Sequence, residues 1–469
     1  MFCDECYLGF FNDSLEGVII VKNSDICVFD AEYSFEKYDY RTPLKFGGVS
    51  TDHCVIFNVK VRVRTRDGKE AEGLGSMPLG NVWAFPPKYV PFDQSLQAMQ
   101  EIAERAVKST RQCDFVGHPI DISHILEIEF LKIAEEVSVE MDLSVPVPKL
   151  CSVVTTSPID AAIHDGFGKA NGINSYHGLS VDYMERDLSH YLNDRFSGKY
   201  LDQYVLETPQ SRIPLYHLVG ALDPLTDADV PNRLNDGLPE TLPEWIVADG
   251  LTHLKIKLNG SNLDWDVDRV LSIEKVTAET QINRGIDQWF YSADFNETCQ
   301  DVEYLLEFLA KIQEGAGSAF DRLAYIEQPT DRDLKAHPQN KMHQAAKIKP
   351  VVIDESLTDF ETFLLAREQG YSGVALKACK GQSQALLMGA AAQEYDMFLA
   401  VQDLTCPGAS FLHSAGIAAR VKGITAIEGN GRQFCPAANE DWREKFPSVF
   451  VISDGTIGTY VLTGNGLGH

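Results

Sequence analysis

Seven short apolar runs in the second half of the chain each end in a charged residue. In chain order these residues are Lys257, Asp294, Glu327, Asp354, Lys377, Asp403 and Glu428. Their spacing stays between 23 residues, from Asp354 to Lys377, and 37 residues, from Lys257 to Asp294. Because a buried charge without a partner is costly, one such residue alone would be expected to face solvent. Seven in succession indicate that the charged ends meet at one place and share a function.

The three carboxylates in the middle of this series predict a metal site. Asp294, Glu327 and Asp354 would stand at the ends of three successive strands. Three carboxylates with room for water suit a hard, octahedral cation, and Mg²⁺ is the foremost candidate. The sequence has no His-Glu-x-x-His motif or cysteine cage that would indicate zinc.

The lysines on either side of the carboxylates are candidate bases. Lys255 and Lys257 point the same way, because side chains two residues apart share a strand face, and Lys377 lies nearly across from them. A cation and a second ammonium both lower the pKa of a lysine, so we expect one lysine to be neutral near pH 7. The predicted chemistry is removal of the proton next to a carboxylate. The neutral amine takes that proton, while the metal and a second lysine stabilise the ene-diolate.

The charged ends belong to a repeating pattern of strands and helices. Apolar runs alternate with amphipathic stretches, and we predict eight strands, at residues 213–219, 253–258, 289–294, 323–328, 351–354, 374–377, 397–403 and 424–428. Such alternation implies right-handed βαβ units and a parallel sheet, and eight repeats suit a closed (β/α)₈ barrel of the TIM type. An open doubly wound sheet would need a glycine-rich phosphate loop after an early strand, where the sequence has none.

The first 150 residues show a different, α+β pattern. Residues 55–65 alternate apolar and polar side chains, and Asp67-Gly68 turns the chain into a second strand, which predicts a hairpin with one buried face. Gly73 and Gly75 are assigned to turns, because no strand-loop-helix setting surrounds them.

Helices are expected next, with helical spacing of apolar residues at 96–106 and 122–134. Ser157-Pro158 is expected to cap and begin a third helix. The tail has strand-like texture at 449–452 and 458–462.

Two structural units follow from these patterns. We expect an α+β capping domain at residues 1–150, with the tail 434–469 packing back onto it. The barrel would span residues 151–433, with insertions near 183–212 and 222–243.

Composition and charge exclude several classes of protein. The chain has 469 residues, of which 44% are hydrophobic and 23% charged, as in soluble globular proteins. Its 41 basic and 68 acidic residues give a net charge of −27, which argues against nucleic-acid binding. No apolar run approaches the roughly 20 residues of a membrane span.

The scattered cysteines and the first residues predict a cytoplasmic protein. Ten dispersed cysteines fit reduced thiols, and the amino terminus carries acidic residues where a signal peptide carries basic ones. Cys3 and Cys6 form an isolated Cys-x-x-Cys, to which we assign no metal or redox function.

Five short motifs, in this order and spacing, resemble those of the enolase superfamily, specifically its muconate-lactonizing-enzyme-like branch. They are Lys255-Ile256-Lys257, Asp294-Phe295-Asn296, Ile326-Glu327-Gln328-Pro329, Ile353-Asp354-Glu355-Ser356 and Leu376-Lys377. The resemblance covers nearly the whole chain, and it implies a capping domain, a modified barrel and bound Mg²⁺ held by the three carboxylates.

The same resemblance implies roles for the three lysines. Lys257 would be the base on one face of a small-molecule carboxylate, and Lys377 its counterpart on the other face. Lys255 would lower the pKa of Lys257 and contact the substrate carboxylate, in keeping with the use of a lysine base and Mg²⁺ in this superfamily. Similar proteins commonly assemble as homo-oligomers, and we expect the same here.

The chain also departs from related branches. Asp403 stands where the mandelate-racemase branch would have a histidine, and Glu428-Gly429-Asn430 replaces the Asp-x-Asp that is usual in dipeptide epimerases. We interpret Asp403 and Glu428 either as structural partners of the lysines or as specificity groups. True enolase lacks the Lys-x-Lys pair, so phosphoglycerate dehydration is not expected.

Five further residues have expected positions near this centre. Asn296 and Glu355 would support the metal ligands, and Lys380 is expected to be solvated. Arg41 and Trp83 lie in capping-domain loops, which in similar proteins close over the barrel mouth and select the substrate.

Several reactions fit two lysines on opposite faces of a carboxylate. Racemisation or epimerisation and cycloisomerisation are favoured, and dehydration of a sugar acid or hydroxy acid is the alternative. A non-catalytic binding or scaffold protein that retains the fold is disfavoured, because no ligand or lysine is missing. A phosphate-binding barrel with other chemistry has weak support, from Gly429 and Gly431 alone.

Overall fold

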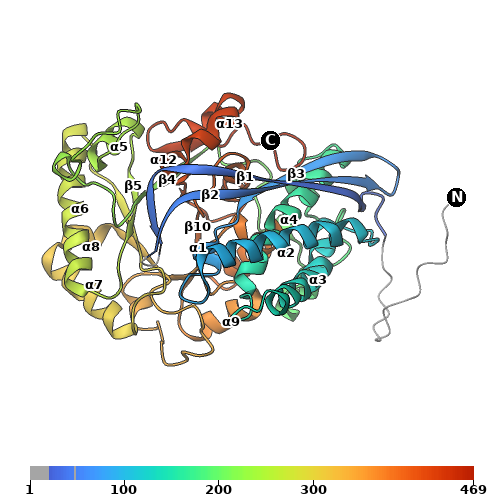
Figure 1. The fold of residues 1–469 in the computed structure, drawn as a ribbon, viewed down its shortest axis with the longest axis horizontal. Coiled ribbons are helices and arrows are strands. Elements are labelled where there is room, and N and C mark those ends of the chain that lie inside the picture. Colours follow the sequence, from blue (N-terminus) through green and yellow to red (C-terminus); the bar gives the residue numbers. More distant parts are fainter. Residues whose placement is uncertain (1–20, 47–48) are drawn as a thin grey trace.

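The chain forms a closed parallel barrel next to a long antiparallel sheet with its own helices (Figure 1). The structure, a computed structural model, describes residues 21–46 and 49–469. Cys3 and Cys6 lie outside the described residues. The eight cysteines within them are free thiols.

The barrel consists of eight parallel strands in sequential order, and it closes where β11 pairs with β4. The strands are β4 Arg212–Val219, β5 His253–Lys257, β6 Phe290–Asp294, β7 Leu323–Glu327, β8 Val351–Ile353, β9 Gly373–Leu376, β10 Phe398–Val401 and β11 Ile427–Glu428. The helices that follow them are α5 Leu242–Asp249, α6 Leu263–Arg284, α7 Val302–Gly315, α8 Gly317–Arg322, α9 Phe360–Glu368, α10 Gln382–Glu394 and α11 Ala409–Arg420. All eight predicted strands and the predicted fold class are confirmed.

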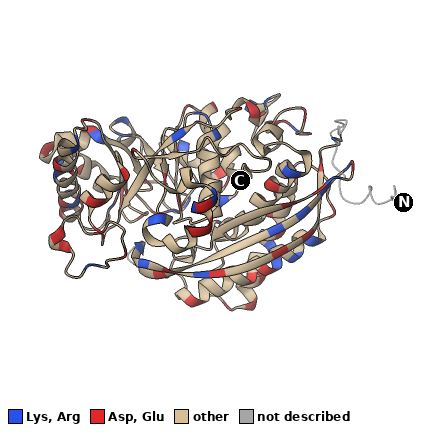
Figure 2. Ribbon diagram, turned by 90° about the horizontal axis from the view of Figure 1, so that it is seen from above, with Lys and Arg blue, Asp and Glu red and all other residues tan. Residues whose placement is uncertain are grey.

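The capping sheet has three antiparallel strands, β1 Ile26–Phe46, β2 Val49–Thr65 and β3 Glu70–Pro78. The predicted hairpin is β2 and β3, and its alternation is observed: Val59, Val61 and Val63 are fully buried. Lys60 and Arg64 on the opposite face form ion pairs with acidic residues of β3. Figure 2 shows this mixture of charges along the exposed face of the sheet.

Helices α1 Asn81–Ala84, α2 Phe92–Gln112, α3 Pro119–Glu140 and α4 Lys149–Asn171 accompany this sheet. The two predicted helices, at 96–106 and 122–134, are confirmed within α2 and α3. The predicted start of the third helix is wrong, because α4 begins at Lys149 and contains Pro158 in its interior. Pro158 has no N–H to donate to the Val154 carbonyl one turn back, and the Ser157 hydroxyl donates to that oxygen instead, at 2.9 Å. This substitute bond lets the helix continue through the proline.

Gly73 and Gly75 are not turn residues but lie within β3, which corrects the sequence assignment. A Cβ atom at Gly75 would lie 1.8 Å from the Pro158 carbonyl oxygen, and one at Gly73 would lie 2.0 Å from that of Ala162. The two glycines therefore allow α4 to pack directly on the sheet backbone. Since α4 runs across the predicted boundary at residue 150, the division into domains stays a prediction.

The tail contacts both parts of the molecule. It contains α12 Gly431–Phe434, α13 Glu440–Lys445, α14 Pro447–Phe450 and β12 Thr456–Gly458. β12 pairs antiparallel with β4, and the Leu467 N–H donates to Asp165 of α4 at 2.9 Å. The strand predicted at 449–452 is wrong: a helix begins at Pro447, whose fixed φ suits a first helical turn. The strand predicted at 458–462 is wrong as well, because β12 ends at Gly458.

The connecting segments contain short 3₁₀ helices rather than further strands. They are η1 Ser175–Gly178, η2 Leu188–His190, η3 Asp194–Phe196, η4 Leu201–Gln203, η5 Asp227–Asp229, η6 Ala345–Lys347, η7 Ala378–Lys380 and η8 Pro436–Asn439. None of the helices in the described part of the chain has the length and apolarity needed to span a membrane.

Candidate active site

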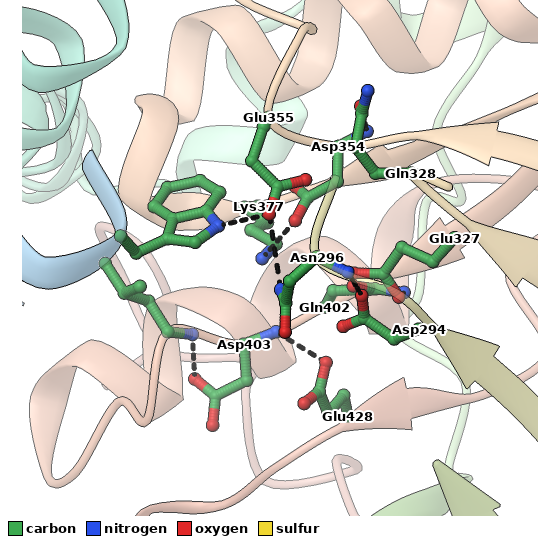
Figure 3. Close-up of polar contacts among 12 residues, drawn as sticks. Asp294, Asn296, Glu327, Gln328, Asp354, Glu355, Lys377, Gln402, Asp403 and Glu428 are labelled. Carbon is green, nitrogen blue, oxygen red and sulfur yellow. Dashed lines mark hydrogen bonds and ion pairs between the residues drawn. The ribbon is translucent and has the colours of Figure 1, made fainter. Parts of the chain in front are cut away.

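Six of the seven charged strand ends, all except Asp403, converge on one polar layer inside the barrel. Figure 3 shows five of them, namely Asp294, Glu327, Asp354, Lys377 and Glu428. We call this layer the polar ring and define it as Lys255, Lys257, Asp294, Glu327, Asp354, Lys377, Gln402 and Glu428. No member is more than 6% exposed. Five members each follow, by two residues, a member of one buried apolar cluster, namely Tyr325, Val352, Ala375, Ala400 and Ala426. Because side chains two residues apart share a strand face, the ring is the next inward-facing layer above that cluster.

Lys255 lies among the acidic members of the ring. Its Nζ is 3.0 Å from Asp294 Oδ2, 2.8 Å from Glu327 Oε2 and 2.8 Å from Glu428 Oε2. It also donates to Gln402 Oε1 at 2.9 Å. Burial opposes the charge of Lys255, but the three carboxylates raise its pKa well above the ordinary value. Lys255 is therefore a fixed positive charge between strands β6, β7 and β11.

Lys257 is positioned by β6 and by the loop that follows it. It donates to Asn296 Oδ1 at 2.8 Å and forms a close ion pair with Asp294, its register partner on β6. The Asn296 amide donates in turn to Glu355 at 3.3 Å. Asn296 has a φ of 44°, a left-handed conformation that asparagine tolerates better than most residues. Asn296 and Glu355 thus lie beside the ring, as expected.

Lys377 lies at the opposite end of the acidic strands, where it is covered by the capping domain. Its Nζ is 2.8 Å from Asp354 Oδ2 and 4.4 Å from the centre of the Trp83 ring. The Trp83 indole N–H donates to Glu355 at 2.9 Å. Burial and the adjacent Asp354 raise the pKa of Glu355 to about 7. Trp83 lies in the short helix α1 and not in a loop as predicted, and it contacts the site directly.

The prediction that Lys380 is solvated is wrong, because its side chain is buried. It is 2% exposed, donates to the main-chain oxygen of Asp354, and its Nζ lies 3.2 Å from Asp354 Oδ1. The short turn η7 directs Lys380 back toward β8, which residue spacing along the strand does not reveal. Although burial opposes the charge of Asp354, Lys377 and Lys380 lower its pKa to about 2.

The expectation of a neutral lysine depends on a bound cation, and in the metal-free protein the pKa values of Lys255 and Lys377 are raised instead. Burial lowers the pKa of each lysine, but facing carboxylates outweigh burial and raise both values. For Lys377 the strongest opposing group is Asp354.

Gln402, rather than Asp403, is the inward-facing residue after β10. The Gln402 amide donates to Glu327 and, at 3.1 Å, to the Tyr325 hydroxyl. Asp403 instead accepts the main-chain N–H of Cys406 and of Asn430, both at 2.8 Å, and so links the loops after β10 and β11. Burial and the nearby Glu428 raise the pKa of Asp403 to about 6. Period-two alternation from Ala400 identifies Gln402 as the inward-facing residue, although Asp403 carries the charge.

Arg41 lies apart from the contacts of the ring. It donates twice to Asp236 of the 222–243 insertion, at 2.5 and 2.9 Å, and to the Leu238 carbonyl at 3.3 Å. Its side chain is one wall of a cavity of about 260 Å³ beside β4. The prediction that Arg41 lies in a loop is wrong, because it belongs to β1, and its side chain joins the capping sheet to the segment 222–243.

The three predicted metal ligands have the burial and chemistry that a hard cation needs. Within residues 21–46 and 49–469, no three His, Cys, Asp or Glu side chains are already arranged as a metal site, and ammonium groups contact the carboxylates. Asp294, Glu327 and Asp354 are fully buried at the adjacent ends of β6, β7 and β8. Neither side-chain oxygen of Asp354 accepts a well-aligned hydrogen bond. Burial and the nearby Asp294 raise the pKa of Glu327 well above its ordinary value, as expected where carboxylates crowd together. The donor set therefore fits Mg²⁺.

Comparisons with known proteins agree with the fold. Residues 238–469 match the family model described as enolase C-terminal domain-like. A muconate lactonizing enzyme from Pseudomonas fluorescens, complexed with muconolactone, is 17% identical with a TM-score of 0.59, over 94% of this chain and 96% of that one. A dipeptide epimerase from Enterococcus faecalis, complexed with Mg and L-Leu-L-Tyr, is 14% identical with a TM-score of 0.62, over 95% and 99%.

A third solved structure, the L-Ala-D/L-Glu epimerase from Bacillus subtilis, is 16% identical with a TM-score of 0.61, over 94% of this chain and 98% of that one. A search of curated protein sequences finds no match. At these identities the structural likeness establishes the fold, and the chemistry has to be argued from the site.

Proposed function

We propose that this chain is a Mg²⁺-dependent enzyme of the enolase superfamily, in its muconate-lactonizing-enzyme-like branch, and that it removes the α-proton of a carboxylate substrate. One observation carries the proposal. Lys257 ends β5 and Lys377 follows β9, so in the strand order β5-β6-β7-β8-β9 the two amines flank the three acidic strands. A substrate held at the acidic strands would have one amine on each side.

Asp294, Glu327 and Asp354 would hold the metal. When bound there, Mg²⁺ supplies positive charge that stabilises negative charge developing on the substrate carboxylate. Lys255, which contacts two of these ligands, contributes a second fixed positive charge beside the same carboxylate.

The two flanking lysines move the proton. Lys257 Nζ takes the α-proton on one face of the substrate, and Lys377 Nζ delivers or takes a proton on the opposite face. Asn296 orients Lys257 through its 2.8 Å hydrogen bond, and Trp83 covers Lys377 and excludes water from that face. A base on each face favours an isomerase, either a racemase or epimerase or a cycloisomerase.

Proton exchange in D₂O tests this proposal. A panel of carboxylic acids is incubated with the protein, with and without Mg²⁺, and α-deuterium incorporation is followed by NMR. We expect Mg²⁺-dependent exchange that is lost in Lys257→Ala for one enantiomer and in Lys377→Ala for the other. The matched control is Lys275→Ala, on the exposed face of α6.

Three outcomes would contradict the proposal: exchange that needs no divalent cation, exchange that survives loss of both lysines, or no exchange across a broad panel. Formation of a 2-keto product, detected with semicarbazide, would redirect the assignment from isomerase to dehydratase.

A further inference from the structure

The carboxylate of Asp403 is buried, and both of its oxygens accept hydrogen bonds. Asp403 is 5% exposed. Its Oδ1 accepts the main-chain N–H of Leu404 at 2.9 Å and of Cys406 at 2.8 Å, and its Oδ2 accepts that of Asn430 at 2.8 Å. A substrate would have to displace one of these bonds in order to bind Asp403. The arrangement therefore favours the interpretation of Asp403 as a structural partner over that of a specificity group.

The turn that follows Asp403 has a strained backbone. Thr405 has a φ of 52°, a left-handed conformation that a β-branched residue rarely adopts. The N–H groups of Leu404 and Cys406, on either side of Thr405, both bind Asp403 Oδ1 and stabilise this conformation. The Leu404 side chain packs on the start of α1, where a Cβ atom at Gly80 would lie 2.5 Å from it. The turn is thus fixed by the Asp403 carboxylate on one side and by the capping domain on the other.

A chain of hydrogen bonds connects Asp403 to Lys255. The main-chain N–H of Asn430 binds Asp403, and the side-chain amide of Asn430 donates to Glu428 Oε1 at 2.7 Å. The other oxygen of Glu428, Oε2, accepts from Lys255 at 2.8 Å. The main-chain N–H of Asp403 also lies 3.5 Å from Glu428 Oε2 (Figure 3). Asn430, Glu428 and Lys255 are each at most 3% exposed, so these bonds are shielded from solvent.

Glu428 differs from the other carboxylates that contact Lys255. Asp294 and Glu327, the other two, are proposed ligands of Mg²⁺. Glu428 is therefore the carboxylate that remains for Lys255 alone once a cation is bound. A charged hydrogen bond that is lost inside the protein is costly, because no water replaces it. The groups that hold Glu428 in place consequently determine where the positive charge of Lys255 lies.

We propose that Asp403 is a positioning residue, which fixes the backbone at Asn430 so that the Asn430 amide holds Glu428 against Lys255. The consequence for the reaction rests on the proposed function. In that function Lys255 supplies its charge beside the substrate carboxylate, and Asp403 acts on the chemical step without touching the substrate. The consequence for Lys255 in the resting protein does not depend on that function.

NMR of the Lys255 ammonium tests the positioning independently of catalysis. The metal-free protein is labelled with ¹⁵N at the lysine Nζ atoms, and the Lys255 signal is assigned by its loss in Lys255→Met. Asp403→Asn keeps the size of the side chain but replaces an acceptor oxygen by an NH₂ group. We expect the Lys255 ammonium of this variant to exchange its protons with solvent about 10-fold faster, because its bond to Glu428 opens more often.

Asp165→Asn is the matched control for Asp403→Asn. Asp165 is fully buried and, like Asp403, joins separate segments by accepting main-chain N–H groups. Its donors are Leu74 at 2.8 Å and Leu467 at 2.9 Å, which belong to β3 and the tail rather than to the ring. We expect this control to lose a similar free energy of unfolding and to leave Lys255 exchange unchanged. The inference is overturned if Lys255 exchange is unchanged in Asp403→Asn, or if it changes equally in both variants.

A double-mutant cycle tests the route through Asn430. Asn430→Ala removes the amide that binds Glu428 but keeps the main-chain N–H that binds Asp403. We expect Asn430→Ala to speed Lys255 exchange about 10-fold as well, and the double variant to be no faster than either single variant. Effects that multiply in the double variant would mean that Asp403 acts on Lys255 by another route, and they would overturn the inference.

The catalytic arm uses the acids whose α-proton exchanges in D₂O. We expect Asp403→Asn to lower kcat about 10-fold with little change in KM, because the charge of Lys255 is needed most in the transition state. Asp165→Asn should change neither constant. A rise in KM alone would assign Asp403 to substrate selection and overturn the inference while leaving the proposed function intact. If no acid exchanges with the wild type while Asp403→Asn still speeds Lys255 exchange, the positioning of Lys255 is supported and the proposed function is contradicted.

Discussion

The polar ring and the cavity of about 260 Å³ beside β4 border each other at Leu218, the register partner of Lys255, yet their charged groups are arranged differently. In the ring, lysines and carboxylates from different strands face one another without exposure, as Lys255 faces Glu327. In the cavity, the charged groups pair with loop residues, as Arg41 pairs with Asp236, and leucines remain exposed. The comparison indicates that the barrel strands hold the buried charges of the ring against one another, whereas the charges beside the cavity are held by contacts with the segment 222–243.

Loss of a carboxylate in the ring is expected to have the largest effect. Glu327→Gln removes one of three proposed Mg²⁺ ligands, so exchange activity should fall at least about 1000-fold and Mg²⁺ affinity at least about 100-fold. Isothermal titration calorimetry and the D₂O assay measure the two effects, with Glu314→Gln on the exposed surface of α7 as the control. Unchanged Mg²⁺ affinity would remove Glu327 from the metal site.

Removal of the central lysine should destabilise the metal-free protein. Lys255→Met leaves the carboxylates of Asp294, Glu327 and Glu428 without their common partner, and breaking a buried ion pair in this way costs about 3–5 kcal/mol. Urea denaturation in EDTA measures this loss, with Lys275→Met as the control. Saturating Mg²⁺ should recover part of it, because a dication would neutralise two of the same carboxylates. Equal losses with and without Mg²⁺ would contradict the proposed metal position.

The contact between the capping domain and the ring should matter less. Trp83→Phe keeps the aromatic ring over Lys377 but removes the indole donor to Glu355, which should cost about 1–3 kcal/mol in the free energy of unfolding. The control is Trp442→Phe in α13, a tryptophan that stacks on Phe446. If both variants lose the same free energy of unfolding, the hydrogen bond from Trp83 to Glu355 does not contribute measurably to stability.

The smallest effect on stability is expected at the ion pair between Arg41 of β1 and Asp236, beside the cavity. The Arg41–Asp236 pair is partly exposed, so Arg41→Gln should cost at most about 1 kcal/mol. It should nevertheless raise KM several-fold with little change in kcat, because the insertion loses its attachment to the capping domain. Arg62→Gln, which breaks a surface pair on the capping sheet, should change neither constant. A fall in kcat for Arg41→Gln would contradict this prediction, because it would mean that Arg41 acts on the chemical step and not only on substrate binding.

The strand ends of the ring could be predicted because their signal is local. An apolar run that ends in a charged residue is visible in one short segment, and period-two alternation then assigns Lys255, Asp294 and Glu327 to one layer. The same rule identifies Gln402 once Ala400 is known to face inward. The sequence prediction placed Asp403 in the ring because Asp403 is charged, whereas alternation assigns that position to Gln402.

Other features depended on contacts between distant segments. Pro158 normally ends a helix, but the Ser157 hydroxyl satisfies the carbonyl that the proline leaves open, so α4 continues. Gly73 and Gly75 lie in a strand that a helix covers closely, a contact that their spacing does not reveal.

The amino-acid sequence by itself determined the barrel and most of its polar layer, because both follow from short-range periodicity in apolar and charged residues. The tertiary structure decided which charges face one another, why Lys380 is buried against Asp354, and how Arg41, the insertion and Gln433 together form a cavity. Those arrangements join residues up to hundreds of positions apart, and packing and pairing between such residues have no period in the sequence from which they could be predicted.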